Sequence, residues 1–428
     1  MYDKLYIMNI RQLLLLSLSI CFSITAIKAQ NPDKISKAVQ DSLFRVWRLE
    51  YEQEALQRQA EFLFWLDTTK ITNLFQLDMS KMMLKKMPDL NRFRNLKQVD
   101  FSGNELKVVA AVDFMTDSLK TIHLENNQLR KVHFPSSESV VMVSLHDNKL
   151  KKIPRSIRKL KNLRFLDLEK NQIRRIPRFI KDLDSLKEIN LNYNKVRLSK
   201  SSIRRLARLE QLSIGANKII NLPSNMGEMQ HLRTLIIGKN KLSELPPSFA
   251  GLKTLEHVNF YENNFTEFPA EILLLPRLVE IDFYYNQLSS LPDGLGNLSN
   301  LTHLFLSFNK LTVLPDTLRN LKKLSNLYAH NNRLTTLPAW IGQLSELQRI
   351  GLGYNQITDL PDLTNLPLLT DLDVQSNLIR RFPWELLDKK GIQLLMLKNN
   401  RIRMNNQELE KLKRRKEELM MQGFVLIY

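Results

Sequence analysis

The sequence predicts an α/β solenoid, an array of stacked repeats with a parallel β-sheet on its concave face and a helical cap at each end. Three observations predict this fold class. A 23-residue pattern recurs along most of the 428 residues, which is typical of repeat proteins. Apolar and polar residues alternate within each unit, as in a half-buried strand. Each unit carries too few apolar residues to form a core alone, so neighbouring units must stack and share one.

The first 29 residues are predicted to be a signal peptide, 1–29, rather than part of the fold. Arg11 precedes the apolar run "LLLLSLSICFSITAI", and the small residue Ala29 offers a cleavage site. The run is too short to span a membrane comfortably. We therefore expect an exported protein, secreted, periplasmic or associated with the cell envelope. If the leader is not cleaved, the chain is instead a cytoplasmic signalling scaffold.

Cysteine usage limits the chemistry of the mature chain. Cys21 is the single cysteine and lies inside the predicted leader. After cleavage no disulfide, thiol nucleophile or cysteine-based metal site remains. No segment after residue 29 is apolar enough over a sufficient length to be a transmembrane segment.

Both ends of the array need covers, because an open sheet edge and core would otherwise be exposed. Residues 30–70 are predicted to form the N-terminal helical cap, with apolar residues at helical spacing within 36–66: Val39, Leu43, Val46 and Trp47. Residues 403–428 are predicted to form a helix–strand cap at the other end. The helical face there carries Leu409, Leu412 and Leu419, and "GFVLIY" supplies the last strand. A helix lying on a membrane surface is the alternative for this basic segment.

The repeat is clearest in "LRFLDLEKNQIRRIP", "LRTLIIGKNKLSELP" and "LVEIDFYYNQLSSLP". These share the frame L-x-x-L-x-L-x-x-N-x-L-x-x-L-P. An asparagine amide offers two donors and an acceptor, so at the turn after each strand it can satisfy backbone groups of its own and adjacent turns. We expect a structural asparagine ladder made of Asn104, Asn127, Asn148, Asn171, Asn194, Asn217, Asn240, Asn263, Asn286, Asn309, Asn332, Asn355, Asn377 and Asn400.

Proline recurs six residues after most of these asparagines, as Pro292 does after Asn286. Because proline cannot donate to a strand ladder, it marks where the chain passes around the outside of the array. The repeat of Asn194 has Lys200 in this place, and the stretch 104–147 lacks such a proline. Irregular outer turns are predicted at both.

The array at 71–402, about fifteen repeats, resembles the leucine-rich repeat family, a resemblance carried by the asparagine register and the "LP" ending over about 330 residues. The 23-residue spacing is similar to that of the Ras-group-type repeats and their bacterial relatives. The cysteine-bounded caps of many animal extracellular members are missing. The resemblance implies a horseshoe with the sheet inside. It does not imply a particular partner, because the fold is shared by binders of unrelated targets.

Four positions of each repeat are expected to face the concave side or its rim, six, four, two and one residues before the asparagine. Over the fourteen repeats these positions carry eleven acidic and four basic residues, so the inner face of this basic protein is acidic. Aromatic residues concentrate there in neighbouring repeats, and contiguous exposed aromatic surface is typical of protein-binding sites. The predicted protein-binding site is Tyr261, Glu280, Asp282, Tyr284, Tyr285, His303, Phe305, Phe308, Tyr328, His330 and Tyr354. The other interpretation is that aromatic residues simply suit strands.

The formal net charge of +19 has one main source, the segment 149–208, with 20 Lys and Arg against 5 Asp and Glu. Its charges recur at equal offsets in successive repeats, which predicts columns of cations on the outer or flanking surface. This flank is a candidate site for anionic lipid, glycan or an acidic protein; a solvated face that favours solubility is the other interpretation. Nucleic acid is not expected, because aromatic residues are not interleaved with these bases. The columns are formed by Lys151, Arg155, Arg158, Arg174, Arg178, Lys181, Arg197 and Arg204.

No catalytic or metal-binding pattern emerges. The chain lacks H-E-x-x-H, a P-loop and G-x-S-x-G before a helix. His257, His303 and His330 are too widely spaced along the array to share an ion, by the strand spacing. We therefore expect no enzyme, no metal and no cofactor. The predicted function is an exported scaffold that binds another protein on the concave face; the alternative is docking to anionic lipid or glycan through the 149–208 flank.

Overall fold

The computed structural model describes residues 37–69, 73–111, 118–421 and 423–428 and divides the chain into two compact units, 1–69 and 70–428. The predicted signal peptide lies outside the described residues. The first unit contains helix α2 (Lys37–Thr68), where the helix within 36–66 was predicted. The side chains of Val39, Leu43 and Trp47 are not among those described, so the capping role of this helix stays a prediction. Among the described residues, no helix combines the length and the apolar character that a membrane span requires.

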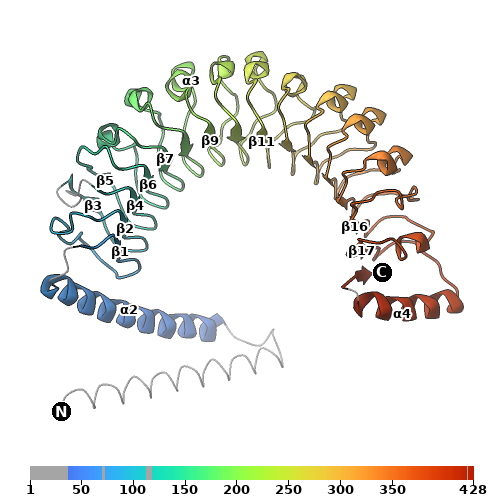
Figure 1. Ribbon diagram of the computed structural model, residues 1–428, viewed down its shortest axis with the longest axis horizontal. Helices are drawn as coiled ribbons and strands as arrows, with labels where there is room; N and C mark the ends of the chain where they lie inside the picture. The colour runs from blue at the N-terminus through green and yellow to red at the C-terminus, as the bar shows by residue number, and fades with distance from the viewer. Residues whose placement is uncertain (1–36, 70–72, 112–117, 422) are drawn as a thin grey trace, which may run out of the picture. The chain divides into compact units, whose positions relative to one another are not determined.

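The second unit is a solenoid built on one parallel sheet of 16 strands, which follow one another in chain order along the inner edge of an arc (Figure 1). This confirms the predicted fold class. The register is constant from repeat to repeat, with each central apolar residue buried and its two neighbours turned outward. The strands are β1 (Gln76–Asp78), β2 (Gln98–Asp100), β4 (Thr121–His123), β6 (Met142–Ser144), β7 (Phe165–Asp167), β8 (Glu188–Asn190), β9 (Gln211–Ser213), β10 (Thr234–Ile236), β11 (His257–Asn259), β12 (Glu280–Asp282), β13 (His303–Phe305), β14 (Asn326–Tyr328), β15 (Arg349–Gly351), β16 (Asp371–Asp373), β17 (Leu394–Met396) and β18 (Val425–Ile427).

Short 3₁₀ helices form the outer edge of the arc (Figure 1). A repeat of 23 residues leaves room for only about one and a half turns there, which the tighter 3₁₀ helix fits. Proline usually precedes them, as Pro292 precedes η7, because its fixed φ suits the residue before a helix. They are η2 (Arg155–Lys159), η3 (Arg178–Asp182), η4 (Met226–Glu228), η5 (Pro247–Gly251), η6 (Ala270–Leu274), η7 (Asp293–Asn297), η8 (Asp316–Asn320), η9 (Ala339–Gln343) and η10 (Trp384–Leu386).

The outer side changes where the proline pattern breaks. Helix α3 (Lys200–Leu206) starts at the lysine that replaces the proline, and Ser199 caps it by accepting from the backbone N–H of Ser202. In the stretch 104–147, which lacks the proline six residues after the asparagine, the outer side instead holds a second, two-stranded sheet of β3 (Val108–Val109) and β5 (Lys131–Val132). Both irregular outer turns were therefore predicted at the right places.

Asparagine side chains tie each repeat to the one before it. The amide of Asn263 donates to the carbonyl of Phe260 at 3.0 Å in its own repeat and to that of Ile237 at 3.2 Å in the preceding one. Its Oδ1 accepts from the backbone N–H of Leu242 at 3.0 Å. The equivalent contacts are made by all fourteen asparagines from Asn104 to Asn400.

The C-terminal end closes with helix α4 (Asn406–Met421) and strand β18, which pairs with β17. Leu412 and Leu419 are buried. The prediction that Leu409 shares their buried face was wrong: its side chain is 37% exposed. It lies in the first turn of α4, beside an open hollow that Tyr428 also lines.

Candidate binding face

Strand register places the predicted inner-face residues in columns. Asp282 is paired with Phe305, and Phe305 with Tyr328, in consecutive strands. These residues flank buried central residues such as Ile281, so their side chains point away from the core. The inner face is thus a grid whose rows are strands and whose columns are fixed offsets from the asparagine.

Four aromatic rings gather after β11, β12 and β13, and we call them the tyrosine stack: Tyr261, Tyr284, Tyr285 and Phe308. Tyr261 and Tyr284 stack with ring centroids 5.4 Å apart, and Tyr285 and Phe308 stack at 4.1 Å. Tyr284 joins the two pairs, with its ring 4.6 Å from that of Tyr285 and 5.1 Å from that of Phe308. Such separations favour ring–ring attraction beyond simple burial. The stack remains open to a ligand, since Tyr285 is 42% exposed.

A second pair of rings lies on the neighbouring column. Phe305 and Tyr328 stack almost parallel, with centroids 5.4 Å apart. His303 packs 6.2 Å from Phe305, and His330 packs 6.1 Å from Tyr328. Tyr354, the remaining predicted aromatic, is half exposed and makes no ring contact with the described residues. The predicted aromatic residues therefore form two stacks and one separate side chain.

The residue just before each asparagine has a left-handed backbone. Tyr285, Phe308 and Tyr354 have φ of 55°, 56° and 59°. Bulky residues are uncommon in this conformation, which asparagine, aspartate and glycine tolerate better. Other repeats have the same conformation with residues such as Lys170, Lys239 and Ser376, so it belongs to the repeat turn and does not single out the aromatic residues.

The side chain of Asp282 is partly buried on the inner face. One of its carboxylate oxygens accepts from the backbone N–H of Tyr284 at 2.8 Å, and the other accepts from the side chain of Asn259 at 2.5 Å. Burial raises the pKa of Asp282 to about 6, and the nearby charge of Glu280 adds to the rise, although the backbone hydrogen bond opposes it. This carboxyl therefore changes charge close to neutral pH.

His330 is held within the face by two glycines. Its Nδ1 accepts from the backbone N–H of Gly353 at 3.1 Å, and burial lowers the pKa of its ring despite the nearby Asp373. A Cβ on Gly351 would lie 2.2 Å from Nε2 of His330. Glycine at this position is required because the histidine ring occupies the space of a side chain, a relation that the repeat pattern alone does not reveal.

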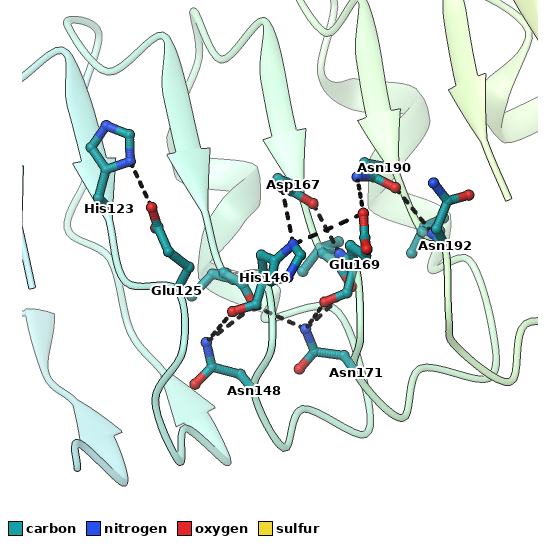
Figure 2. A network of polar contacts seen from close by, with 12 residues as sticks. His123, Glu125, His146, Asn148, Asp167, Glu169, Asn171, Asn190 and Asn192 are labelled. Atoms are coloured by element: carbon teal, nitrogen blue, oxygen red, sulfur yellow. Dashed lines mark hydrogen bonds and ion pairs between the residues drawn. The ribbon is translucent and has the colours of Figure 1, made fainter. Parts of the chain in front are cut away.

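A second polar cluster lies on the inner face between β4 and β8 (Figure 2). His123 contacts Glu125 at 3.2 Å. Their hydrogen bond raises the pKa of His123. Burial alone would raise the pKa of Glu125, but the hydrogen bonds from His123 and from the backbone outweigh burial and lower it. Beyond this pair lie His146 and the acids Asp167 and Glu169. The sequence prediction omitted these histidines, although they share the offsets of the aromatic columns five to nine repeats farther along.

The predicted flank residues are all exposed. Lys151, Arg155 and Arg174 line a groove of about 800 Å³ together with four further cations, Lys152, Arg175, Lys195 and Arg205. Lys181 and Arg204 instead line a neighbouring hollow that also contains acids, and each has a carboxylate within 4 Å. Arg197 lines a third hollow with Arg174. Arg158 and Arg178 lie on η2 and η3. The flank is thus several hollows, and the groove of about 800 Å³ and the hollow at Arg197 are lined by cations without an acid.

Comparison with known proteins agrees with this geometry. The "Leucine rich repeat" family model matches residues 117–173 and 276–334. No curated protein matches the chain. Among solved structures, a leucine-rich repeat protein of Leptospira interrogans is 28% identical, with a TM-score of 0.73, and the match covers 88% of this chain and 98% of that one.

Two other structures are similar over less of their length or at lower identity. A plant peptide hormone receptor, RGFR1 in complex with RGF2, is 28% identical with a TM-score of 0.53; the match covers 78% of this chain and 62% of the receptor. An internalin of Listeria monocytogenes is 20% identical with a TM-score of 0.54, over 79% of this chain and 82% of that one, and supports the fold alone. The repeat register, the parallel sheet and these matches together show that the chain folds as a leucine-rich repeat solenoid, similar to that of the Leptospira protein.

Proposed function

We propose that this protein is an exported, non-enzymatic scaffold that binds another protein through the concave face, at the tyrosine stack and the adjoining Phe305–Tyr328 pair. The observation that carries the proposal is the set of ordered aromatic rings on an outward face. Aromatic side chains that are rigid and partly exposed are typical of binding hot spots.

The chemistry of the face agrees with such a role. Partly exposed rings close to Glu280 and Asp282 offer apolar contact area next to negative charge, which suits a partner with apolar and basic side chains. The plant receptor that is 28% identical to this chain is itself in complex with RGF2. Most repeat positions elsewhere on the face carry small or polar residues, so recognition is proposed at one region rather than along the whole array.

The test compares three full-length proteins in a pull-down from an extract of the source cell's envelope. The patch variant carries Tyr261, Tyr284, Phe305 and Tyr328 all changed to Ser, and the control variant changes Phe165 and Tyr193, two exposed aromatic residues outside the patch, to Ser. A partner identified by mass spectrometry is then purified and titrated against each protein. We expect the patch variant to lose at least about thirtyfold in affinity, or about 2 kcal/mol, and the control to lose little.

Equal losses in both variants would contradict the proposal, as would retention of the partner by a folded patch variant. Export is tested separately by N-terminal sequencing of the mature protein, which we expect to begin at Gln30. An intact leader would instead support a cytoplasmic scaffold.

A second candidate function is docking to phosphate-bearing lipid through the basic groove. Its seven lining cations, with Phe179 and Pro177 supplying apolar surface, favour a ligand that joins negative charge to an apolar part. Vesicles containing phosphatidylglycerol should bind the wild type and release it at moderate salt. A variant with Lys151, Arg155 and Arg174 changed to Gln should bind less, whereas vesicles of phosphatidylcholine should bind neither. Binding that resists salt would contradict this function.

A further inference from the structure

Three potential metal ligands converge on the inner face beside β6 and β7. His146 follows β6 by two residues, Asp167 ends β7, and Glu169 follows β7 by two residues. Figure 2 shows the imidazole of His146 directed toward the carboxylates of the next repeat. This grouping is a consequence of register, because His146 and Glu169 occupy the same offset in adjacent repeats and Asp167 the neighbouring offset.

The separations suit an ion better than direct hydrogen bonds. Nδ1 of His146 is 3.8 Å from Oδ2 of Asp167 and 3.9 Å from Oε2 of Glu169, beyond hydrogen-bond range. The three ligand atoms all lie within 4.8 Å of one another. Two ligand atoms of a tetrahedral zinc are about 3.4 Å apart. Small side-chain rotations would bring the three ligand atoms to the separations that zinc requires.

Neighbouring groups already orient the two carboxylates. The backbone N–H of Glu169 donates to Oδ1 of Asp167 at 2.9 Å, which leaves Oδ2 directed toward His146. The side chain of Asn190 donates to Oε2 of Glu169 at 3.0 Å, and its own Oδ1 accepts from the backbone N–H of Asn192. Supporting hydrogen bonds of this kind fix the ligands of metal sites and tune their affinity.

Local charge favours a cation. Asp167 and Glu169 carry like charge and are partly buried, and Glu125, in the repeat before that of His146, adds a third carboxylate. One oxygen of Glu125 is buried and accepts no hydrogen bond from the described residues. A divalent cation between the carboxylates would relieve the repulsion between these like charges.

The ligand set also selects the kind of ion. Calcium and magnesium prefer oxygen ligands in larger numbers, whereas imidazole with carboxylates suits zinc and related transition metals. We propose that His146, Asp167 and Glu169 bind one zinc ion on the concave face, with a fourth position open to water. This site is separate from the tyrosine stack, which begins after β11, so it does not depend on the proposed protein-binding function.

The experiment is a zinc titration of the full-length protein by calorimetry, after treatment with a chelator and dialysis. We expect one zinc per chain for the wild type and binding weakened at least about tenfold for His146→Gln, Asp167→Asn and Glu169→Gln. Asn190→Ala, which removes a supporting hydrogen bond, should weaken binding by about tenfold. Zinc should also raise the melting temperature of the wild type but not that of His146→Gln, since only a folded site binds.

The matched control is His257→Gln. His257 faces Glu280 on the same inner face at 3.8 Å, the separation found at His146, but without a second carboxylate in the described cluster. This variant should bind zinc as the wild type does. The proposal is overturned if the wild type binds no zinc, if His257→Gln loses as much affinity as His146→Gln, or if calcium at equal concentration displaces the ion. Far-ultraviolet circular dichroism of each variant verifies that it is folded.

Discussion

At the scale of single residues, this protein places polar and titratable groups where burial changes their behaviour. An asparagine repeated along the array satisfies backbone groups that would otherwise be buried without partners. Asp282 is partly buried and hydrogen-bonded to Asn259 and to the backbone N–H of Tyr284, and burial raises its pKa to about 6. Two substitutions test these roles directly.

Asn263→Ala should lower the free energy of unfolding by about 3 kcal/mol. The change removes the hydrogen-bond partner of the carbonyls of Phe260 and Ile237 and of the N–H of Leu242. Each buried unsatisfied group costs about 1 to 3 kcal/mol, and water or local relaxation offsets part of this cost. The control is Asn264→Ala, whose exposed side chain lies one position later. Urea unfolding followed by circular dichroism measures both. Similar losses at the two positions would contradict the ladder as a source of stability.

Asp282 should make the stability of the array depend on pH. Because its pKa in the folded state, about 6, is above the unfolded value of 3.8, the folded protein retains a proton that the unfolded chain has lost. The resulting stabilisation is complete below about pH 4 and disappears as pH rises through about 6, by up to about 3 kcal/mol. Asp282→Asn cannot titrate, so its stability relative to the wild type should increase between pH 4.5 and pH 7. A difference that stays constant over this range would exclude the raised pKa.

At the scale of elements, the strands are uniform and the outer segments vary. Every strand of the main sheet has a central buried residue, so equivalent strand positions have the same role in different repeats. The outer side is formed instead by 3₁₀ helices, the helix α3 or the small sheet of β3 and β5, according to local proline and capping residues. The ends of the array are elements of their own, and α4 offers a direct test.

Leu412→Ala should destabilise the C-terminal end by about 2 to 5 kcal/mol, because this side chain is fully buried. Leu409→Ala, on the same helix but exposed, should cost less than about 1 kcal/mol. Hydrogen exchange is the suitable measurement, since a repeat array opens locally. In Leu412→Ala, faster hydrogen exchange should appear first in β17 and β18. Equal exchange in the two variants would show that α4 does not cover this edge.

At the scale of the whole array, charge is distributed unevenly. The segment 149–208 carries 20 basic and 5 acidic residues, while the inner face holds clusters of acids. Like charges stacked on successive repeats repel one another across a few ångströms, unless salt or a ligand screens them. The electrostatic repulsion between neighbouring repeats therefore depends on ionic strength.

Raising sodium chloride from about 10 mM to about 500 mM should raise the melting temperature of the wild type, because the screening length falls from about 30 Å to below 8 Å. Arg174→Gln with Arg197→Gln, which removes two stacked cations, should reduce this rise. The matched pair Lys310→Gln with Arg333→Gln removes two exposed cations at a shared offset outside the basic segment. This control variant should reduce the salt-dependent rise in melting temperature less than the Arg174 and Arg197 variant does. Identical salt dependence in all three proteins would contradict a destabilising cation column.

Most of the architecture could be predicted from the sequence because the repeat carries its own register. Once an asparagine is assigned to the turn, the strand, the inward apolar residues and the outward columns follow by counting, and the stacks of Tyr261 on Tyr284 and of Phe305 on Tyr328 agree with that count. Counting cannot predict how side chains fill space. The enclosure of Asp282 and the placement of the His330 ring over Gly351 depend on packing between neighbours.

The His146 cluster was missed for a different reason. Its residues occupy columns that the sequence already defined, and a search of those columns for histidine beside acid would have found it. The distances that make it a candidate metal site, 3.8 and 3.9 Å, depend on side-chain rotamers that no repeat pattern specifies.

The constant register of the inner sheet has a further consequence for the shape of any partner. Neighbouring strands repeat about every 4.8 Å, whereas side chains on one face of an extended peptide repeat about every 6.7 Å. The strand spacing and the peptide's side-chain spacing coincide again only after about 34 Å, or about seven strands. The tyrosine stack follows only β11, β12 and β13, so an extended peptide lying across the strands would meet it in phase once. A loop or helix tip that presents a compact group of side chains can match all four rings together.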